Sequence, residues 1–147
     1  MTPKRTDAED LLALALQHAA LAVLKQQKRA EGDVWFTEDP PKLHRTLKDI
    51  RDRYSQAFPE LGELSFSSEG AFPYSPELRQ ILGNLQLDGV IGRRNPSFDR
   101  FSPNIFPDTE QVVDLELKEF FGKDRDRLEA FLHLADELRE RLVVRAK

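Results

Sequence analysis

One stretch, from residue 66 to residue 106, limits the fold of this chain more than any other. Within it, Ser75, Pro76 and Glu77 mark the start of a helix. A serine hydroxyl can cap a free backbone N–H, proline loses no hydrogen bond at the first helical position, and an acid favours the positive end of the helix dipole. We therefore expect a helix over residues 76–88, with an apolar stripe at helical spacing. The stripe consists of Leu78, Ile81, Leu82 and Leu85.

The residues after this helix are typical of a small β-hairpin. Gly89 suits the left-handed residue that follows a helix, and Val90 and Ile91 suit a buried strand. Residues 92–99 then predict a turn, and residues 100–102 a returning strand that Pro103 ends or confines to an edge. Upstream, Leu64 and Phe66 alternate with serines, as in a short strand that joins the hairpin. A helix followed by a hairpin predicts a winged-helix-like core.

Part of this stretch resembles a known family. Residues 72–78, Phe-Pro-Tyr-Ser-Pro-Glu-Leu, with Leu85 and the later Gly-Val-Ile of residues 89–91, resemble the Gly-Pro-Tyr-Ser-x-Glu-Leu … Leu … Gly-Leu-Ile core of the Panacea (SocA-like) antitoxin domains and related phage-associated proteins. The resemblance covers Phe66 to Ile91. The chain has Phe72 where the pattern has glycine, and its N-terminal part has no clear match. The resemblance implies a regulatory or toxin-neutralising protein.

Length and composition predict one domain over residues 1–147. The expected parts are a helical N-terminal part at 6–58, the winged-helix-like part at 64–106 and C-terminal helices at 108–146. The chain is 39% hydrophobic and 33% charged, as in a globular protein that is soluble. It has no Cys, which excludes disulfides and thiol nucleophiles and favours a reducing cytoplasm. We expect neither a signal peptide nor a membrane span. The fold class is mostly α with a small β-hairpin (α+β).

Two long helices are expected before the hairpin region. Thr6 and Glu9 stand at capping-box spacing, and the Leu- and Ala-rich run after them is apolar on more than one face. Such a helix lies at the centre of a bundle or in a dimer interface. The second helix, at about 41–58, has the clearest apolar periodicity of the chain. Its apolar positions are Leu43, Leu47, Ile50, Tyr54 and Phe58.

Two further helices are expected after the hairpin region. In the first, which starts near Asp108, we expect Val112, Leu115 and Phe120 to face inward. Val113, Leu117 and Phe121 are expected to lie alongside them. The last helix, from about residue 124, has one apolar stripe. That stripe consists of Leu128, Phe131, Leu132, Ala135, Leu138 and Leu142.

The sequence contains no recognisable catalytic or metal-binding motif, and enzyme is the least favoured class. Its three histidines, at positions 18, 44 and 133, lie on different predicted helices. His133 has Glu129 and Glu137 four residues to either side, which suits a carboxylate-steered base or half a metal site. We favour the simpler interpretation of a surface histidine among solvated acids. We predict no cofactor, no metal ion and no catalytic residue.

The first functional hypothesis is a DNA-binding regulator, with helix 76–88 in the major groove. Its outward side chains would be Arg79, Gln80 and Asn84, which suit base edges. The 92–100 wing would contact phosphates. Its cations are Arg93, Arg94 and Arg100. The second helix adds cations that are either a solvated face or phosphate contacts. These are Lys42, Arg45, Lys48, Arg51 and Arg53. The net charge of −4 disfavours DNA as a partner.

The second hypothesis, which we prefer, is a non-enzymatic protein-interaction module on a winged-helix-like scaffold. The partner would be another protein or a second copy of the chain, as a homodimer. Trp35 is either a core plug or a partner contact, since tryptophan is enriched at interface hot spots. Phe98 either packs the wing back on the body or contacts a partner. No membrane partner is expected.

Overall fold

The computed structural model describes residues 7–27, 34–37, 39–87, 91–92, 102–103 and 108–145. This part of the chain is mostly α-helical, as predicted, and contains five α-helices. The helices are α1 (Asp7–Gln27), α2 (Pro40–Tyr54), α3 (Pro76–Leu87), α4 (Thr109–Phe121) and α5 (Arg125–Leu142). A short 3₁₀ helix, η2 (Pro59–Glu63), lies between α2 and α3. None of the described helices is both long enough and apolar enough to cross a membrane.

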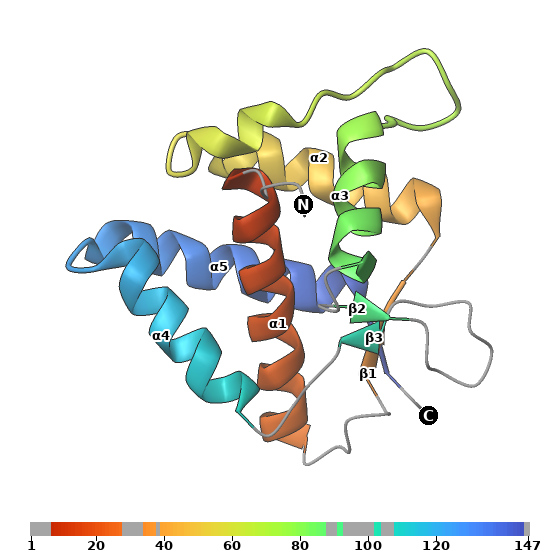
Figure 1. Ribbon diagram of the computed structural model, residues 1–147. Coiled ribbons are helices and arrows are strands. Elements are labelled where there is room, and N and C mark those ends of the chain that lie inside the picture. Colours follow the sequence, from red (N-terminus) through yellow and green to blue (C-terminus); the bar gives the residue numbers. More distant parts are fainter. Residues whose placement is uncertain are drawn as a thin grey trace.

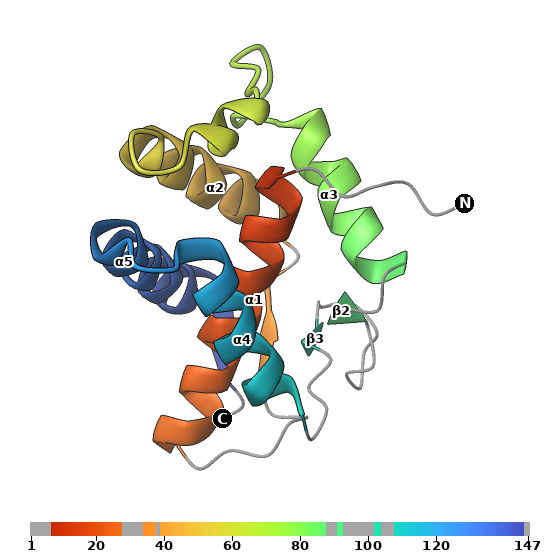
Figure 2. The ribbon, with the colours of Figure 1, turned by 60° about the vertical axis from the view of Figure 1, so that its left-hand side comes forward.

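Helix α1 is the central helix of the bundle. Figure 1 shows it between α4 and α3, with α5 crossing behind it, and Figure 2 shows α5 and α3 on opposite sides of it. It packs against α5 most extensively and also contacts α3, α4 and η2. Most of its leucines and alanines from Ala8 to Val23 are buried, and Leu21 is partly buried against the core. We predicted that this helix lies either at the centre of a bundle or in a dimer interface. Its apolar side chains are part of the core of this chain, at the centre of the bundle.

Helix α2 begins at Pro40, close to the predicted start at about residue 41, but it ends earlier than expected. Leu43, Leu47 and Ile50 are buried. The helix stops at Tyr54, although Phe58 is fully buried in the core. Phe58 precedes Pro59, and a residue before proline is disfavoured in helical conformation; its φ of −131° and ψ of 81° are accordingly non-helical. The side chain therefore reaches the core from a turn that follows the helix.

The inward face of α4 differs from the prediction. Val113 and Phe121 are buried, whereas Val112, Leu115 and Phe120 are 41%, 58% and 39% exposed. The sequence offers two adjacent apolar stripes, so periodicity alone does not choose between them. Contacts of Phe121 with aromatic residues of other elements decide the rotation of the helix. Its ring centroid lies 5.2 Å from that of Phe131 and 6.1 Å from that of Phe58.

The stripe predicted on α5 is mostly correct. Phe131, Ala135, Leu138 and Leu142 are buried, together with Leu134, which the predicted stripe omitted. Leu132 is instead 37% exposed, because it lies beside the stripe that faces α1. Leu128 is partly buried against the core.

Four short strands form two antiparallel pairs. Strand β1 (Val34–Phe36) pairs with β4 (Val143–Arg145), with Trp35 opposite Val144. Strand β2 (Ile91–Gly92) pairs with β3 (Ser102–Pro103), with Ile91 opposite Pro103. Strands β1 and β3 are also close neighbours in space, as Figure 1 shows.

The strand predicted at Leu64 and Phe66 does not form. Leu64 instead follows η2, and its backbone N–H donates to the carbonyl of Leu61. Ser67 makes an isolated antiparallel bridge with Tyr74, seven residues later. The strand that lies beside β3 is β1, from much earlier in the chain. A short alternation of apolar and polar residues cannot distinguish these outcomes, because the pairing partner is set by tertiary contacts.

Candidate functional site

The start of α3 is held by hydrogen bonds from its own cap and from α2. The hydroxyl of Ser75 accepts a hydrogen bond from the backbone N–H of Leu78 at 3.1 Å, which confirms the predicted N-cap. The backbone N–H of Ser75 donates to Nδ1 of His44 at 3.0 Å. Both Ser75 and His44 are buried. Two otherwise unpaired backbone donors at this helix end are therefore satisfied without water.

Aromatic rings surround His44 at the same place. The Tyr74 ring is stacked on the imidazole, with centroids 4.7 Å apart, and the Phe72 ring lies at 5.7 Å. Burial lowers the pKa of His44 from its ordinary value. The lowered pKa favours the neutral ring, which accepts a hydrogen bond at Nδ1, and the Ser75 hydroxyl acts as the cap of α3. This geometry supports a structural role for residues 72–75 of the motif.

Glu77 completes the arrangement at the start of α3. Its carboxylate accepts hydrogen bonds from the hydroxyls of Ser65 and Ser75, the second at 3.3 Å. The hydrogen bond from Ser65 is the main cause of a lowered pKa at Glu77. The acid also lies in the first turn of the helix, where the dipole favours negative charge. The Tyr-Ser-Pro-Glu sequence therefore orients α3 against the body of the protein.

The outward face of α3 carries two of the predicted base-contacting residues. Arg79 and Gln80 are exposed. Asn84 is half-buried, and its Nδ2 donates to Oε1 of Glu9 on α1 at 3.1 Å. Glu9 is only 3% exposed. Asn84 therefore ties α3 to α1, and a contact from it to a base would require breaking this hydrogen bond.

The other predicted site residues fall where the structure gives no side-chain description. Arg93, Arg94, Phe98 and Arg100 lie outside the described residues. Trp35 lies in β1, where its backbone pairing with Val144 is described but its side chain is not. The structure therefore exposes Arg79 and Gln80 on α3, and the contacts expected of the wing arginines, Trp35 and Phe98 stay predictions.

Most cations of α2 are engaged by acids. Asp52 accepts from both Lys48 and Arg51 at 2.9 Å, and these hydrogen bonds hold its pKa below the ordinary value. Arg53 pairs with Glu137 of α5 at 2.8 Å. Arg51 also donates to the carbonyl of Leu64 and lies over the ring of Phe66, 4.8 Å from its centroid. Three of the five cations of this helix are thus paired with acids.

The remaining cations of α2 lie beside an open hollow between the start of α2 and the end of α5. Lys42 and Arg45 are exposed and have no ion-pair partner among the described residues. The hollow has a volume of about 460 Å³ and also carries Asp39 and Glu140 on its rim. Arg141 on the same rim is already paired with Asp49 at 2.9 Å. With charges of both signs, this hollow is not a strong site for a phosphate backbone.

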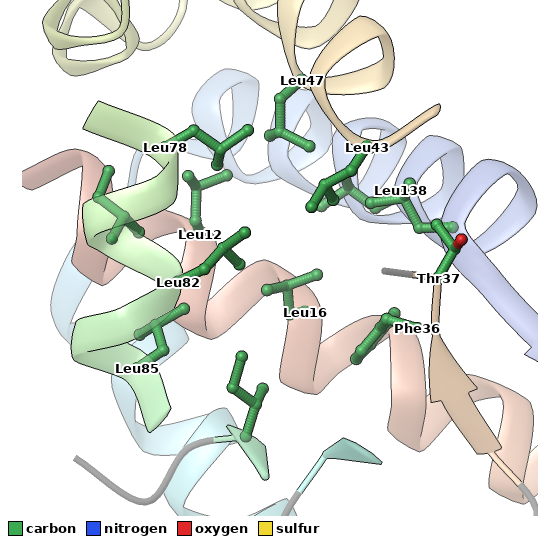
Figure 3. Close-up of a pocket in the computed structure, with 13 residues that line it drawn as sticks. Leu12, Leu16, Phe36, Thr37, Leu43, Leu47, Leu78, Leu82, Leu85 and Leu138 are labelled. Atoms are coloured by element: carbon green, nitrogen blue, oxygen red, sulfur yellow. The ribbon is translucent and has the colours of Figure 1, made fainter. Parts of the chain in front are cut away.

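A small apolar cavity lies under α3, enclosed by α1, α2, α3, α5 and β1 (Figure 3). Its volume is about 20 Å³, which is space for roughly one water. Thr37 is the single polar residue among those that line it. A cavity of this size and polarity is a packing defect and is too small for an organic ligand.

The three histidines lie in different surroundings. His18 packs edge-on against Phe131, with ring centroids 6.0 Å apart, and His133 is exposed on α5. Within the described ranges, no group of three or more metal-ligating side chains converges. The predictions of no enzyme and no metal ion are not tested by this.

Exposed apolar side chains gather on the C-terminal helices. Leu87, at the end of α3, is 86% exposed. The other large apolar side chains that are exposed in the described structure all lie on α4 and α5. They are Val112, Leu115, Phe120 and Leu132. This surface was not predicted, because the apolar periodicity of α4 and α5 places all four residues in the core.

Comparisons with protein-family models, with curated proteins and with solved structures found no match for this chain.

Proposed function

We propose that this chain is a non-enzymatic regulatory protein-interaction module on a winged-helix-like scaffold. The order of elements supports the scaffold: a helix, a strand, two helices and then two paired strands occur from α1 to β3. The position of β1 beside β3 also supports it, because a third strand flanks the paired strands in a winged helix. The N-terminal α1 and the C-terminal α4 and α5 extend this core.

The single observation that carries the interaction role is the exposed apolar surface of α4 and α5. Isolated apolar residues on a surface need no explanation, whereas neighbouring exposed ones, such as Val112 and Leu115 one turn apart on α4, favour an interaction site. Val112, Leu115 and Phe120 lie within one 13-residue helix. The resemblance of residues 66–91 to Panacea antitoxin domains makes toxin neutralisation, or an equivalent regulatory contact, our proposed biological role. The absence of Cys fits a cytoplasmic setting.

The alternative is a sequence-specific DNA-binding regulator. The exposure of Arg79 and Gln80 on α3 favours it. Three observations weigh against it: the bond of Asn84 to Glu9, the pairing of the α2 cations, and the net charge of −4. Phosphate contacts supply most of the affinity of a DNA-binding protein, so a surface with few free cations is a poor candidate.

In-cell photo-crosslinking tests the proposal. A photoreactive phenylalanine analogue replaces Leu115 in one variant and exposed Glu63 in a matched control. We expect a discrete protein adduct at position 115 and none at position 63. The purified chain is then titrated with random duplex DNA at low salt. No adduct at position 115, together with DNA binding that Arg79→Glu abolishes, would replace the proposal with the DNA-binding alternative.

A further inference from the structure

Helix α3 is fastened to the body of the protein by an incomplete set of apolar contacts. Its packing against α1 is much less extensive than that of α5. The cavity of about 20 Å³ lies between α3 and the other elements, and Leu78, Leu82 and Leu85 line it from the α3 side (Figure 3). Side chains that face a void lose the dispersion contacts that atoms there would supply. Hydrogen bonds therefore matter more to the position of α3 than to that of α5.

Two of the described hydrogen bonds join α3 and its cap to other helices. At the start of the helix, the backbone N–H of Ser75 donates to Nδ1 of His44 on α2. Near the end of the helix, the side chain of Asn84 donates to Glu9 on α1. Each bond holds one end of α3. The attachment of its start to α2 thus depends on a single imidazole ring.

Protonation of His44 is incompatible with this arrangement. A neutral imidazole has one acceptor nitrogen, whereas the protonated ring has two N–H donors and no acceptor. A proton on Nδ1 would point at the backbone N–H of Ser75, whose nitrogen lies 3.0 Å away. The positive end of the α3 dipole lies at the same place and also repels a cation. His44 is only 4% exposed, so the charged ring would be poorly solvated.

The groups around His44 provide no compensating negative charge. Tyr74, from the segment before α3, stacks a phenol ring on the imidazole. Glu77, the acid in the first turn of α3, binds two serine hydroxyls instead. No ion pair of His44 is present among the described residues, and burial lowers its pKa. The charged residues of α2 within four positions of it are all cations, namely Lys42, Arg45 and Lys48.

We propose that α3 is an acid-released helix. Protonation of His44 breaks the bond to Ser75 and frees the start of α3 from α2, while α1, α2 and α5 stay packed on one another. The bond of Asn84 to Glu9 keeps the other end of α3 attached. This movement exposes the apolar residues that line the cavity on α1 and α2, and so links pH to the opening of an apolar groove, whatever the partner of the proposed interaction role. The exposed residues are Leu12, Leu16, Leu43 and Leu47.

Native-state hydrogen exchange at pH 7.5 and pH 5.0 tests the proposal, with each rate corrected for the intrinsic exchange rate at that pH. The measured ratio is the protection of the Leu82 and Leu85 amides of α3 relative to that of the Leu134 and Leu138 amides of α5. An ordinary histidine pKa of about 6.5 in the open state limits the fall in this ratio to about thirtyfold. We expect a fall of about threefold to thirtyfold. Global unfolding would instead lower both protections together.

Three variants separate His44 from other titrating groups. His44→Asn places an oxygen acceptor near the position of Nδ1, and His44→Phe keeps an aromatic ring without an acceptor. The ratio should be independent of pH in both. His133→Gln removes an exposed histidine of α5, and its ratio should fall as in the wild type.

An unchanged ratio in the wild type would overturn the proposal. An equal fall in a His44 variant that keeps its helical content by circular dichroism would do the same. An NMR titration of the His44 ring gives a test that needs no variant. The ratio should fall over the pH range in which this ring is protonated, and a fall over any other range would contradict the proposal.

Discussion

The backbone N–H of Ser75 donates to the imidazole Nδ1 of His44 at 3.0 Å, in a buried position below the ring of Tyr74. This hydrogen bond joins the N-cap residue of α3 to the second turn of α2. Because Nδ1 accepts, the neutral ring carries its proton on Nε2. A doubly protonated imidazole could not accept the bond. The attachment of α3 therefore depends on the charge state of one histidine.

The first prediction concerns pH. Burial lowers the pKa of His44 in the folded state, whereas the unfolded chain has the ordinary value of about 6.5. The contribution of His44 to stability is thus fully present above pH ~6.5 and is lost as the pH falls toward the folded-state pKa. His44→Phe keeps an aromatic ring but removes the acceptor. We expect it to lower the free energy of unfolding by about 1–3 kcal/mol at pH 7.5.

Urea denaturation of both proteins at pH 7.5 and pH 5.0 measures this effect. The advantage of the wild type over His44→Phe should shrink at the lower pH. His133→Gln, at an exposed position on α5, is the control and should follow the wild type at both pH values. A constant difference between wild type and His44→Phe would contradict the prediction.

The second prediction concerns the cap of α3. Ser75→Ala removes the acceptor for the backbone N–H of Leu78 and should cost about 1 kcal/mol of unfolding free energy. Thermal and urea unfolding measure it. Ser55→Ala, at the exposed end of α2, removes a hydroxyl with no described hydrogen bond and should be nearly neutral. Equal losses in the two variants would show that the Ser75 hydroxyl does not cap.

The third prediction concerns the contact between α3 and α1. Asn84→Ala deletes a donor to the buried carboxylate of Glu9, so we expect a loss of about 1–3 kcal/mol. Gln86→Ala, on the same helix and with no described partner, is the control and should change stability by less than about 0.5 kcal/mol. A double-mutant cycle with Glu9→Gln measures the coupling. Additive losses in that cycle would show that the two side chains do not interact.

The fourth prediction compares two arginines of α2. Arg51 donates to the carbonyl of Leu64, pairs with Asp52 and covers the ring of Phe66. Arg51→Ala should cost about 1 kcal/mol, mainly through the lost carbonyl bond and ring contact, since exposed ion pairs contribute little. Arg45→Ala should change stability by less than about 0.5 kcal/mol because the residue is exposed and unpaired in the described structure. Equal effects of the two substitutions in urea unfolding would contradict this ranking.

Several local features were predictable from the sequence. The helix start at Ser75 and Pro76 is read from side-chain chemistry that acts within one turn, so its context matters little. The stripe of Leu43, Leu47 and Ile50 was equally clear, because its spacing matches one face of a helix. Proline disfavours a helical conformation in the residue before it, so Pro59 indicates that α2 ends before Phe58. The apolar periodicity, which continues through Phe58, predicts a longer helix instead.

The candidate interaction surface was not predictable in the same way. In α4, Val112 and Val113, and likewise Phe120 and Phe121, are adjacent and almost equally apolar. Either stripe satisfies helical periodicity, so the sequence leaves the rotation of the helix open. The contacts of Phe121 with Phe58 and Phe131 settle it, and each partner is distant in the chain or on the next helix.

The sequence by itself determined where most helices begin, which residues supply the core of α1 and α2, and that the chain is mostly helical. These properties depend on the side chains within a few residues of each position. Tertiary structure alone decided that His44 binds Ser75, that Asn84 binds Glu9, that β1 and not residues 64–66 lies beside β3, and which face of α4 meets solvent. Each of these contacts joins residues that are far apart in the chain or depends on how whole helices pack, and no local pattern encodes that packing.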